Sequence, residues 1–157
     1  IVELGHKAGI SVEGEIGFVG YNQGKESLKT NPNEAKKFAD ETRCDAMAIS
    51  VGNTHLQLDK NTNVDIQDIV AVQNLTDTAL VLHGGSGIDL LLRAKIARET
   101  NVCKFNIGTE LWKTFGDSLR VSLKNNPETY DKIQLLDSTT NDIKKATKIV
   151  IENLSKV

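Results

Sequence analysis

Two histidines each follow a short apolar run of the chain, a placement that suits metal chemistry. His83 follows the run 79–82 and precedes the sequence Gly-Gly-Ser-Gly at 84–87, and His55 comes shortly after the run 46–51. Neutral imidazole is the commonest protein ligand of metals such as zinc, and a catalytic zinc binds about three protein ligands and keeps one position open. One histidine at a strand end is ordinarily satisfied by the backbone. Two on neighbouring strands instead predict a metal site that takes its third ligand from elsewhere.

Glycine-rich backbone after two predicted strands favours phosphate binding. The loop 84–87 leads directly into a predicted helix, where free amide groups and glycines with positive φ can hold an anion. The segment 106–109 offers an amide, a glycine and a hydroxyl after the next predicted strand. Glycines also occur in plain tight turns, so the repetition on two strands carries this prediction. The candidate substrate-binding residues are Gly84, Gly85, Ser86, Asn106, Ile107, Gly108 and Thr109.

Two carboxylates alternate with apolar residues near the start of the chain. Glu13 and Glu15 are separated by Gly14, so in a strand both side chains point to the same face. Unpaired charge inside a sheet protein is costly, which leaves two interpretations. The carboxylates either line a polar site, with Glu15 as a candidate catalytic group, or form structural ion pairs.

Lys104 raises a second chemical possibility. A lysine on a strand is the residue with which Schiff-base aldolases bind their ketose. Cys103 and Phe105 flank Lys104 and Asn106 shares its face, so the sequence leaves its direction open. We rank this alternative below the metal site.

The bulk properties predict one globular unit over residues 1–157. The net charge of -2 and the aromatic content of 4% disfavour nucleic acid as a partner. The apolar runs are shorter than the roughly 18 residues of a spanning helix, and no secretory leader opens the chain, so we expect no membrane partner and a cytoplasmic location. The start at 1–9 has no methionine and resembles the end of a helix, which suggests a cut through a longer protein.

Strand and helix patterns alternate along the chain. We expect strands at 10–16, 45–51, 78–82 and 102–107, and helices at 32–43, 65–74, 88–100, 109–124 and 141–154. This alternation predicts an α/β fold with parallel strands. An open doubly wound sheet fits, but the polar clusters after strand ends favour the C-terminal half of a (β/α)8 TIM barrel, with four β/α units and a C-terminal helix. Half a barrel leaves edges that need a missing N-terminal half or a second copy.

The two cysteines lie at the ends of predicted strands. Cys44 and Cys103 lack the spacing of a metal or redox motif, so we expect both to be buried thiols.

Four motifs in register resemble the class II, metal-dependent ketose-bisphosphate aldolases, which include the fructose- and tagatose-bisphosphate enzymes. The motifs lie at 12–17, 52–55, 80–87 and 104–111, and the similarity extends to 126–131. The match covers nearly the whole chain, and only the C-terminal half of such a barrel. The sequence does not distinguish fructose from tagatose bisphosphate, which differ at one stereocentre.

The resemblance implies reversible aldol cleavage of a ketose 1,6-bisphosphate to dihydroxyacetone phosphate and glyceraldehyde 3-phosphate. His55 and His83 match two of three zinc (Zn²⁺) ligands, and a monovalent cation is a further candidate cofactor. The third ligand and an aspartate that handles a proton belong to the family's first half. A phosphosugar substrate and a homo-oligomer are the implied partners.

Two departures from the family pattern bear on activity. Leu56 stands where the family has a glycine after the second zinc histidine, and could crowd the substrate. Asn22 and Gln23 stand where the family's mobile loop has paired glutamates, and an amide cannot act as a base. Either Glu26 takes that role, or the chain is a degenerate relative that binds phosphosugar without catalysis.

Overall fold

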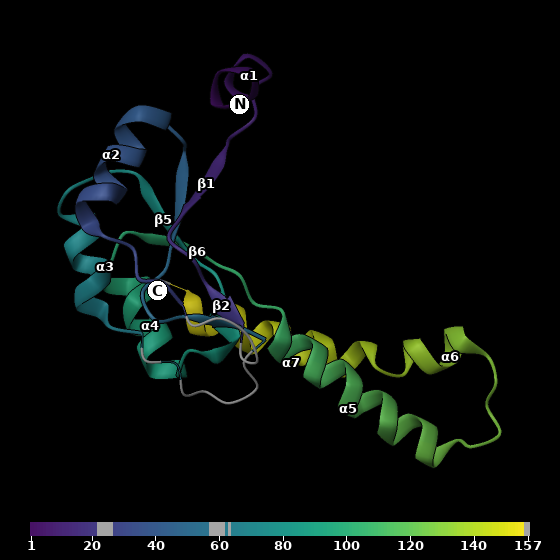
Figure 1. The fold of residues 1–157 in the computed structure, drawn as a ribbon. Coiled ribbons are helices and arrows are strands. Elements are labelled where there is room, and N and C mark those ends of the chain that lie inside the picture. Colours follow the sequence, from purple (N-terminus) through teal and green to yellow (C-terminus); the bar gives the residue numbers. More distant parts are fainter. Residues whose placement is uncertain (22–26, 57–61, 63, 156–157) are drawn as a thin grey trace.

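Four parallel strands form the main sheet of the protein (Figure 1). The computed structural model describes residues 1–21, 27–56, 62 and 64–155. The strands are β1 (Glu13–Ile16), β3 (Ala46–Ile49), β5 (Ala79–Leu82) and β6 (Val102–Phe105), and they pair in that order. The predicted α/β class and the parallel order are therefore confirmed.

The first strand starts later than the sequence pattern predicted. The backbone N–H of Val12 donates to the carboxylate of Asp45 at 2.7 Å. The backbone N–H of Asp45 donates in turn to the carbonyl of Val12 at 2.9 Å. Because the Val12 amide is bound by a side chain, the backbone ladder with β3 begins one residue later, at Glu13 opposite Ala46.

Helices follow the strands as expected. They are α1 (Val2–Lys7), α2 (Pro32–Thr42), α3 (Ile66–Gln73), α4 (Leu90–Glu99), α5 (Thr109–Asn125), α6 (Lys132–Asp137) and α7 (Thr140–Leu154). A side chain caps the start of α2, α3, α4 and α6. The side chain of Asn31 accepts from the first amides of α2, and Asp65 and Asp89 do the same for α3 and α4. The short helix α6 was not predicted.

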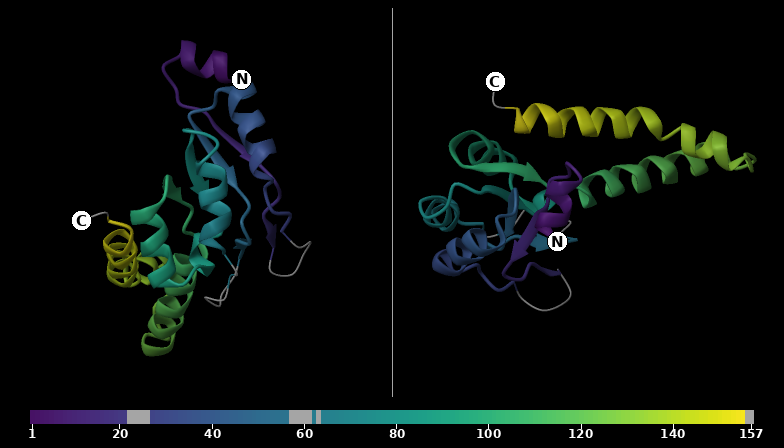
Figure 2. Two further views of the ribbon diagram at one scale, coloured as in Figure 1. Left: turned by 90° about the vertical axis from the view of Figure 1, so that its left-hand side faces the viewer. Right: turned by 90° about the horizontal axis from the view of Figure 1, so that it is seen from above.

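Helices α2, α3 and α4 cover one face of the sheet (Figures 1 and 2). Alternate strand residues point to these helices and form the apolar core with them. The strand members of this core are Met47, Ile49, Leu80, Leu82 and Val102. Ile69 of α3 and Ile96 of α4 are fully buried against them.

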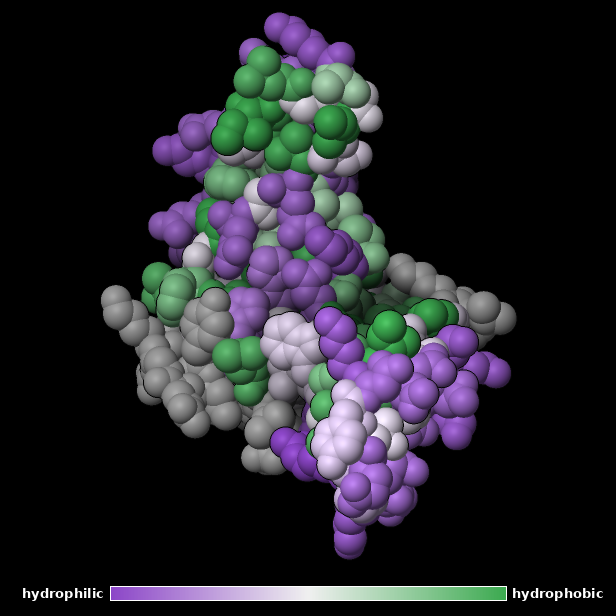
Figure 3. Space-filling model, turned by 90° about the vertical axis from the view of Figure 1, so that its right-hand side faces the viewer, coloured by the Kyte–Doolittle hydropathy of each residue, from purple (hydrophilic) through white to green (hydrophobic). Residues whose placement is uncertain are grey.

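The other face of the sheet is open and polar at its middle, with hydrophobic side chains above it (Figure 3). Ala48 and Val81 of the central strands point to this face. Glu13 of β1 and Lys104 of β6 extend over them from the two sides of the sheet and contact each other. Within the described residues, β1 pairs only with β3 and β6 only with β5, so these two strands are the edges of the sheet.

Two features of the loops and strands differ from the sequence expectations. A second sheet pairs β2 (Gly20–Tyr21) with β4 (Thr54–His55) in segments that were expected to be loops. Cys44 is buried as predicted, but the prediction for Cys103 is wrong, because this side chain is exposed. Cys103 lies on the edge strand β6, between Val102 and Lys104, where the pairing register with β5 shifts. It therefore has no partner residue on β5, and no further described strand pairs with β6 on its other side.

Helices α5 and α7 pack side by side and extend beyond the sheet as an arm, with α6 at its tip (Figures 1 and 2). No helix in the described part of the chain combines the length and apolar character needed to cross a membrane.

A fully buried arginine joins this arm to the sheet. Arg93 of α4 donates from Nε to Asn153 of α7 at 2.8 Å and from Nη1 to Glu110 of α5 at 2.9 Å. Nη1 also lies 3.3 Å from the carbonyl of Gly85, which follows β5. One guanidinium therefore connects two helices of the arm to the loop after a central strand.

We predict that Arg93→Met lowers the free energy of unfolding by about 3–5 kcal/mol, because it strips a largely buried carboxylate of its ion pair. Urea unfolding of the variant measures this loss. The matched control is Arg98→Met on the same helix, where the side chain is exposed and the change should stay within about 0.5 kcal/mol. Equal losses in the two variants would contradict the role assigned to Arg93.

Candidate active site

The two predicted metal-ligating histidines lie next to each other at the carboxyl edge of the sheet. His83 directly follows β5, whereas His55 belongs to β4 rather than to the end of β3. Their ring centroids are 5.7 Å apart, with the ring planes tilted by 48°. Two imidazoles at this separation can approach one cation between them.

Asn53 holds the two histidine segments together. Its side chain is fully buried, donates to the carbonyl of His83 at 2.9 Å and accepts from the backbone of Val51 at 2.8 Å. Sequence reasoning treated Asn53 only as part of a motif. An asparagine at the end of an apolar run was the available signal, because a buried amide has to find partners.

The predicted phosphate-binding segments also lie side by side. The amide of Gly85 donates to the carbonyl of Asn106 at 3.1 Å, and the amide of Asn106 donates to the carbonyl of Leu82 at 2.9 Å. Gly85–Gly87 form a single 3-10 turn, and the hydroxyl of Ser86 accepts from the amide of Glu110 at 3.2 Å. The loop after β5 thus contacts the start of α5.

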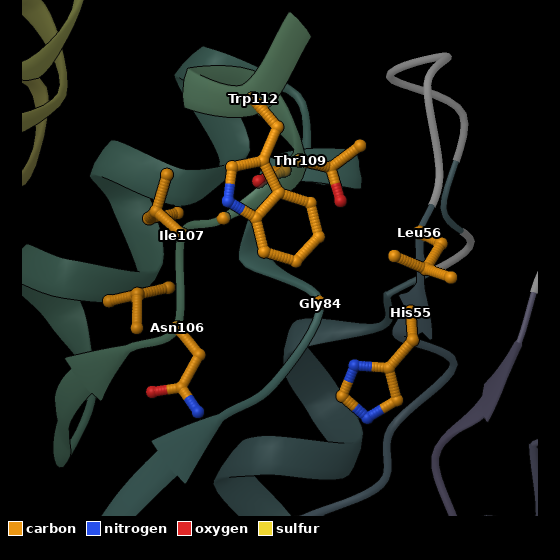
Figure 4. Close-up of a pocket in the computed structure, with 10 residues that line it drawn as sticks. His55, Leu56, Gly84, Asn106, Ile107, Thr109 and Trp112 are labelled. Atoms are coloured by element: carbon orange, nitrogen blue, oxygen red, sulfur yellow. The ribbon is translucent and has the colours of Figure 1, made fainter.

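A pocket of about 430 Å³ opens between these segments (Figure 4). It contains all but one of the seven predicted substrate-binding residues, Gly85 being the exception, and also His55. Leu56, Phe105 and Trp112 complete its lining. Sequence reasoning missed Trp112, the single tryptophan of the chain, although it lies one turn after the segment 106–109.

Glu13 and Glu15 share one face, as the alternation predicted, and both approach His83. Glu13 Oε1 lies 3.3 Å from His83 Nε2, and Glu15 Oε2 lies 3.7 Å from His83 Nδ1. Lys104 Nζ donates to Glu13 Oε2 at 2.7 Å, which settles the direction that the sequence left open for this lysine. Glu26, Asn22 and Gln23 lie outside the described residues.

Burial and charge set the protonation of this cluster. Burial raises the pKa of Glu13, but hydrogen bonds from Lys104 and His83 outweigh it and hold that pKa below its ordinary value of 4.5. Burial, followed by the nearby His83, lowers the pKa of His55 from 6.5, while Glu15 acts in the opposite direction. His55 therefore favours the neutral form, which is the form that binds a metal. Among the described residues, no group of three His, Cys, Asp or Glu side chains is arranged to hold a metal ion.

The family model described as "Fructose-bisphosphate aldolase class-II" matches residues 1–157. The chain belongs to this family. It is similar in structure to the YdjI aldolase from Escherichia coli K12, with 28% identity and a TM-score of 0.76, over 99% of this chain and 52% of that one. It also resembles a fructose-bisphosphate aldolase from Campylobacter jejuni, with 24% identity and a TM-score of 0.74, over 97% of this chain and 53% of that one.

The chain therefore spans about half the length of these solved aldolases. Its four parallel β/α units match half of an aldolase TIM barrel, which confirms the predicted fold class.

We predict that Gly84→Ala destabilises the protein by about 2–5 kcal/mol, from positive φ and steric overlap together. Gly84 has a φ of 64°, and a Cβ there would overlap the backbone of Thr54. Gly9→Ala is the matched control, since Gly9 has a φ of 70° but no atom within 4 Å of an added Cβ, and it should lose only about 1–2 kcal/mol. Urea unfolding compares the two, and equal losses would argue against the close contact with Thr54.

We predict an acid-dependent contribution of Glu13 to stability. Because its pKa is lowered in the folded state, the stabilisation is present at neutral pH and disappears as the pH falls below about 4.5 through the folded pKa. The difference in unfolding free energy between the wild type and Glu13→Gln should shrink over that range. Lys104→Met should remove most of this pH dependence, whereas an unchanged profile in Lys104→Met would contradict the assigned cause.

Proposed function

We propose that this chain carries half of the active site of a metal-dependent aldolase that cleaves a phosphorylated ketose. The observation that carries the proposal is the pair of imidazoles, 5.7 Å apart, beside a pocket lined by amides and hydroxyls. Family membership supports the same reaction class.

His55 and His83 fit a zinc ion as two of its ligands. The donor chemistry is suitable, because imidazole nitrogen binds zinc and burial favours the neutral form of His55. When bound, zinc would act as a Lewis acid that stabilises negative charge on a ketone oxygen. A third ligand and a proton-transferring aspartate would come from outside this chain. A monovalent cation as a second cofactor is a further part of the proposal.

The remaining residues of the site have binding and positioning roles. The backbone of Gly84 and the hydroxyl of Ser86, with the segment 106–109, would hold the phosphate of the dihydroxyacetone phosphate end. Gly85, whose amide donates to the carbonyl of Asn106, would position the loop beside that segment. Glu13 would fix the ring of His83 through the contact between its carboxylate and Nε2 of that ring. Carboxylates commonly orient metal-ligating histidines in this way. Glu15 faces the same histidine and remains a candidate for moving a proton.

We propose further that the substrate is fructose or tagatose bisphosphate, that the enzyme is a homo-oligomer and that it is located in the cytoplasm. A Schiff base on Lys104 is less compatible with the site, because its ammonium is engaged by Glu13 at 2.7 Å. The degenerate, non-catalytic alternative is favoured by one observation, namely that Leu56 lines the pocket.

We predict that His55→Ala and His83→Ala, made in a full-length protein that also supplies the third ligand, each lose bound zinc and more than about 100-fold of aldol cleavage. This exceeds the roughly 10- to 100-fold effect of replacing residues that only orient a metal ligand. His6→Ala is the matched control, since His6 contacts Asp45 at 2.9 Å far from the site. Elemental analysis measures zinc, and a coupled assay measures cleavage of each bisphosphate.

A chelator should abolish the activity and added zinc should restore it. Activity that survives chelation, with Lys104 labelled after borohydride trapping, would establish the Schiff-base alternative. Zinc binding without cleavage of either bisphosphate would establish the degenerate one.

A further inference from the structure

We propose that Leu56 and Trp112 form two apolar walls that contact the carbon chain of a phosphate monoester, so that the pocket selects organic phosphates over inorganic phosphate. This inference rests on the phosphate-binding part of the proposed function. It assigns a selective role to two side chains outside the predicted phosphate-binding segments.

The two side chains stand opposite each other across the pocket. Figure 4 shows Trp112 on one side, Leu56 and His55 on the other, and the backbone of Gly84 between them. Trp112 is 65% exposed and Leu56 is 50% exposed, although both line a pocket. Large apolar side chains left in contact with water beside polar backbone gain from a ligand that covers them.

Leu56 is held in this position against its backbone preference. It has a φ of 56°, a left-handed conformation that residues with a Cβ rarely adopt. The preceding residues Thr54 and His55 pair with Gly20 and Tyr21, and the close approach of Gly84 to Thr54 fixes the same segment. Neighbouring structure therefore imposes the conformation of Leu56, which is typical of residues at binding sites.

Trp112 lies over the start of α5. A Cβ added to Gly108 would lie 3.8 Å from Trp112 Cζ2, an ordinary van der Waals distance, so the indole lies beside this glycine with room for no more than a methyl group between them. The indole face thus borders the segment 106–109, whose amide and hydroxyl groups suit phosphate. A phosphate bound there would bring the attached carbon chain alongside the ring.

The charge of the pocket supports the same assignment. Its described lining contains no lysine, arginine, aspartate or glutamate. A phosphate held by these described amides, hydroxyls and imidazole gains no ion pair from them, although an ion pair commonly strengthens anion binding. Contact between C–H groups of the ligand and the two apolar walls supplies affinity that inorganic phosphate cannot gain.

The test uses the full chain and titrates sn-glycerol 3-phosphate and inorganic phosphate in the presence of EDTA. Glycerol 3-phosphate has a three-carbon chain and no ketone, so its binding requires neither zinc nor turnover. Isothermal titration calorimetry measures both affinities, and the emission of the single tryptophan reports contact with the indole. The aldolase proposal is tested by zinc content and by cleavage of the bisphosphates, whereas this test measures phosphate affinities without metal. A failure of one proposal can therefore be told apart from a failure of the other.

We expect the wild type to bind glycerol 3-phosphate roughly tenfold more tightly than inorganic phosphate, in the range of a small apolar contact. Trp112→Ala and Leu56→Gly should each lose most of that preference while their affinity for inorganic phosphate stays within about twofold. Trp112→Phe, which keeps an aromatic face, should retain the preference. Circular dichroism verifies that each variant is folded, and Leu56→Gly keeps the proposal falsifiable if Trp112→Ala does not fold.

Three results would overturn the proposal. The first is a preference that is absent from the wild type or that stays unchanged in Leu56→Gly and in Trp112→Ala. The second is no binding of either phosphate in EDTA. The third is emission from Trp112 that is already that of a buried indole and does not respond to glycerol 3-phosphate, which would show that another part of the protein or a second copy covers the ring.

Discussion

Parallel pairing of the four strands is the constraint on which the site depends. Because β1, β3, β5 and β6 run in the same direction, the segments that follow them emerge at one edge of the sheet. His83 and the loop 84–87 follow β5, and the segment 106–109 follows β6. Residues more than 20 positions apart in the sequence therefore share one pocket, and hydrogen bonds between the loops fix their relative positions.

The same sheet separates two kinds of interaction on its two faces. One face packs apolar side chains against three helices and provides the stability of the fold. The other carries small residues on its central strands, and these leave room for Glu13 and Lys104 to meet from the two edge strands. The polar face can thus hold charge near His83 because the opposite face supplies the core.

The sequence was sufficient for the four strands of the main sheet, most helices and the proximity of His55 to His83, because apolar periodicity and strand ends are local signals. It could not decide the direction of Lys104 or the exposure of Cys103, since both depend on a register shift and on which strand is an edge. The β2–β4 pair, Asn53 and Arg93 were missed because their partners are distant in sequence. The long α5 was predicted, but the position of Trp112 in the pocket follows from how that helix leaves the sheet.

The buried guanidinium of Arg93 also constrains how the sequence can drift over evolutionary time. Its partners Glu110 and Asn153 lie 17 and 60 positions away, and a third contact is a backbone carbonyl of the glycine loop. Replacing any one of the three side chains leaves the others mismatched around a fully buried guanidinium, so the neutral path is joint replacement. Positions 93, 110 and 153 should consequently covary among relatives. A chimera that exchanges α7 alone would break the contact between Asn153 and Arg93, and would thereby disturb the glycine loop that Arg93 contacts at Gly85.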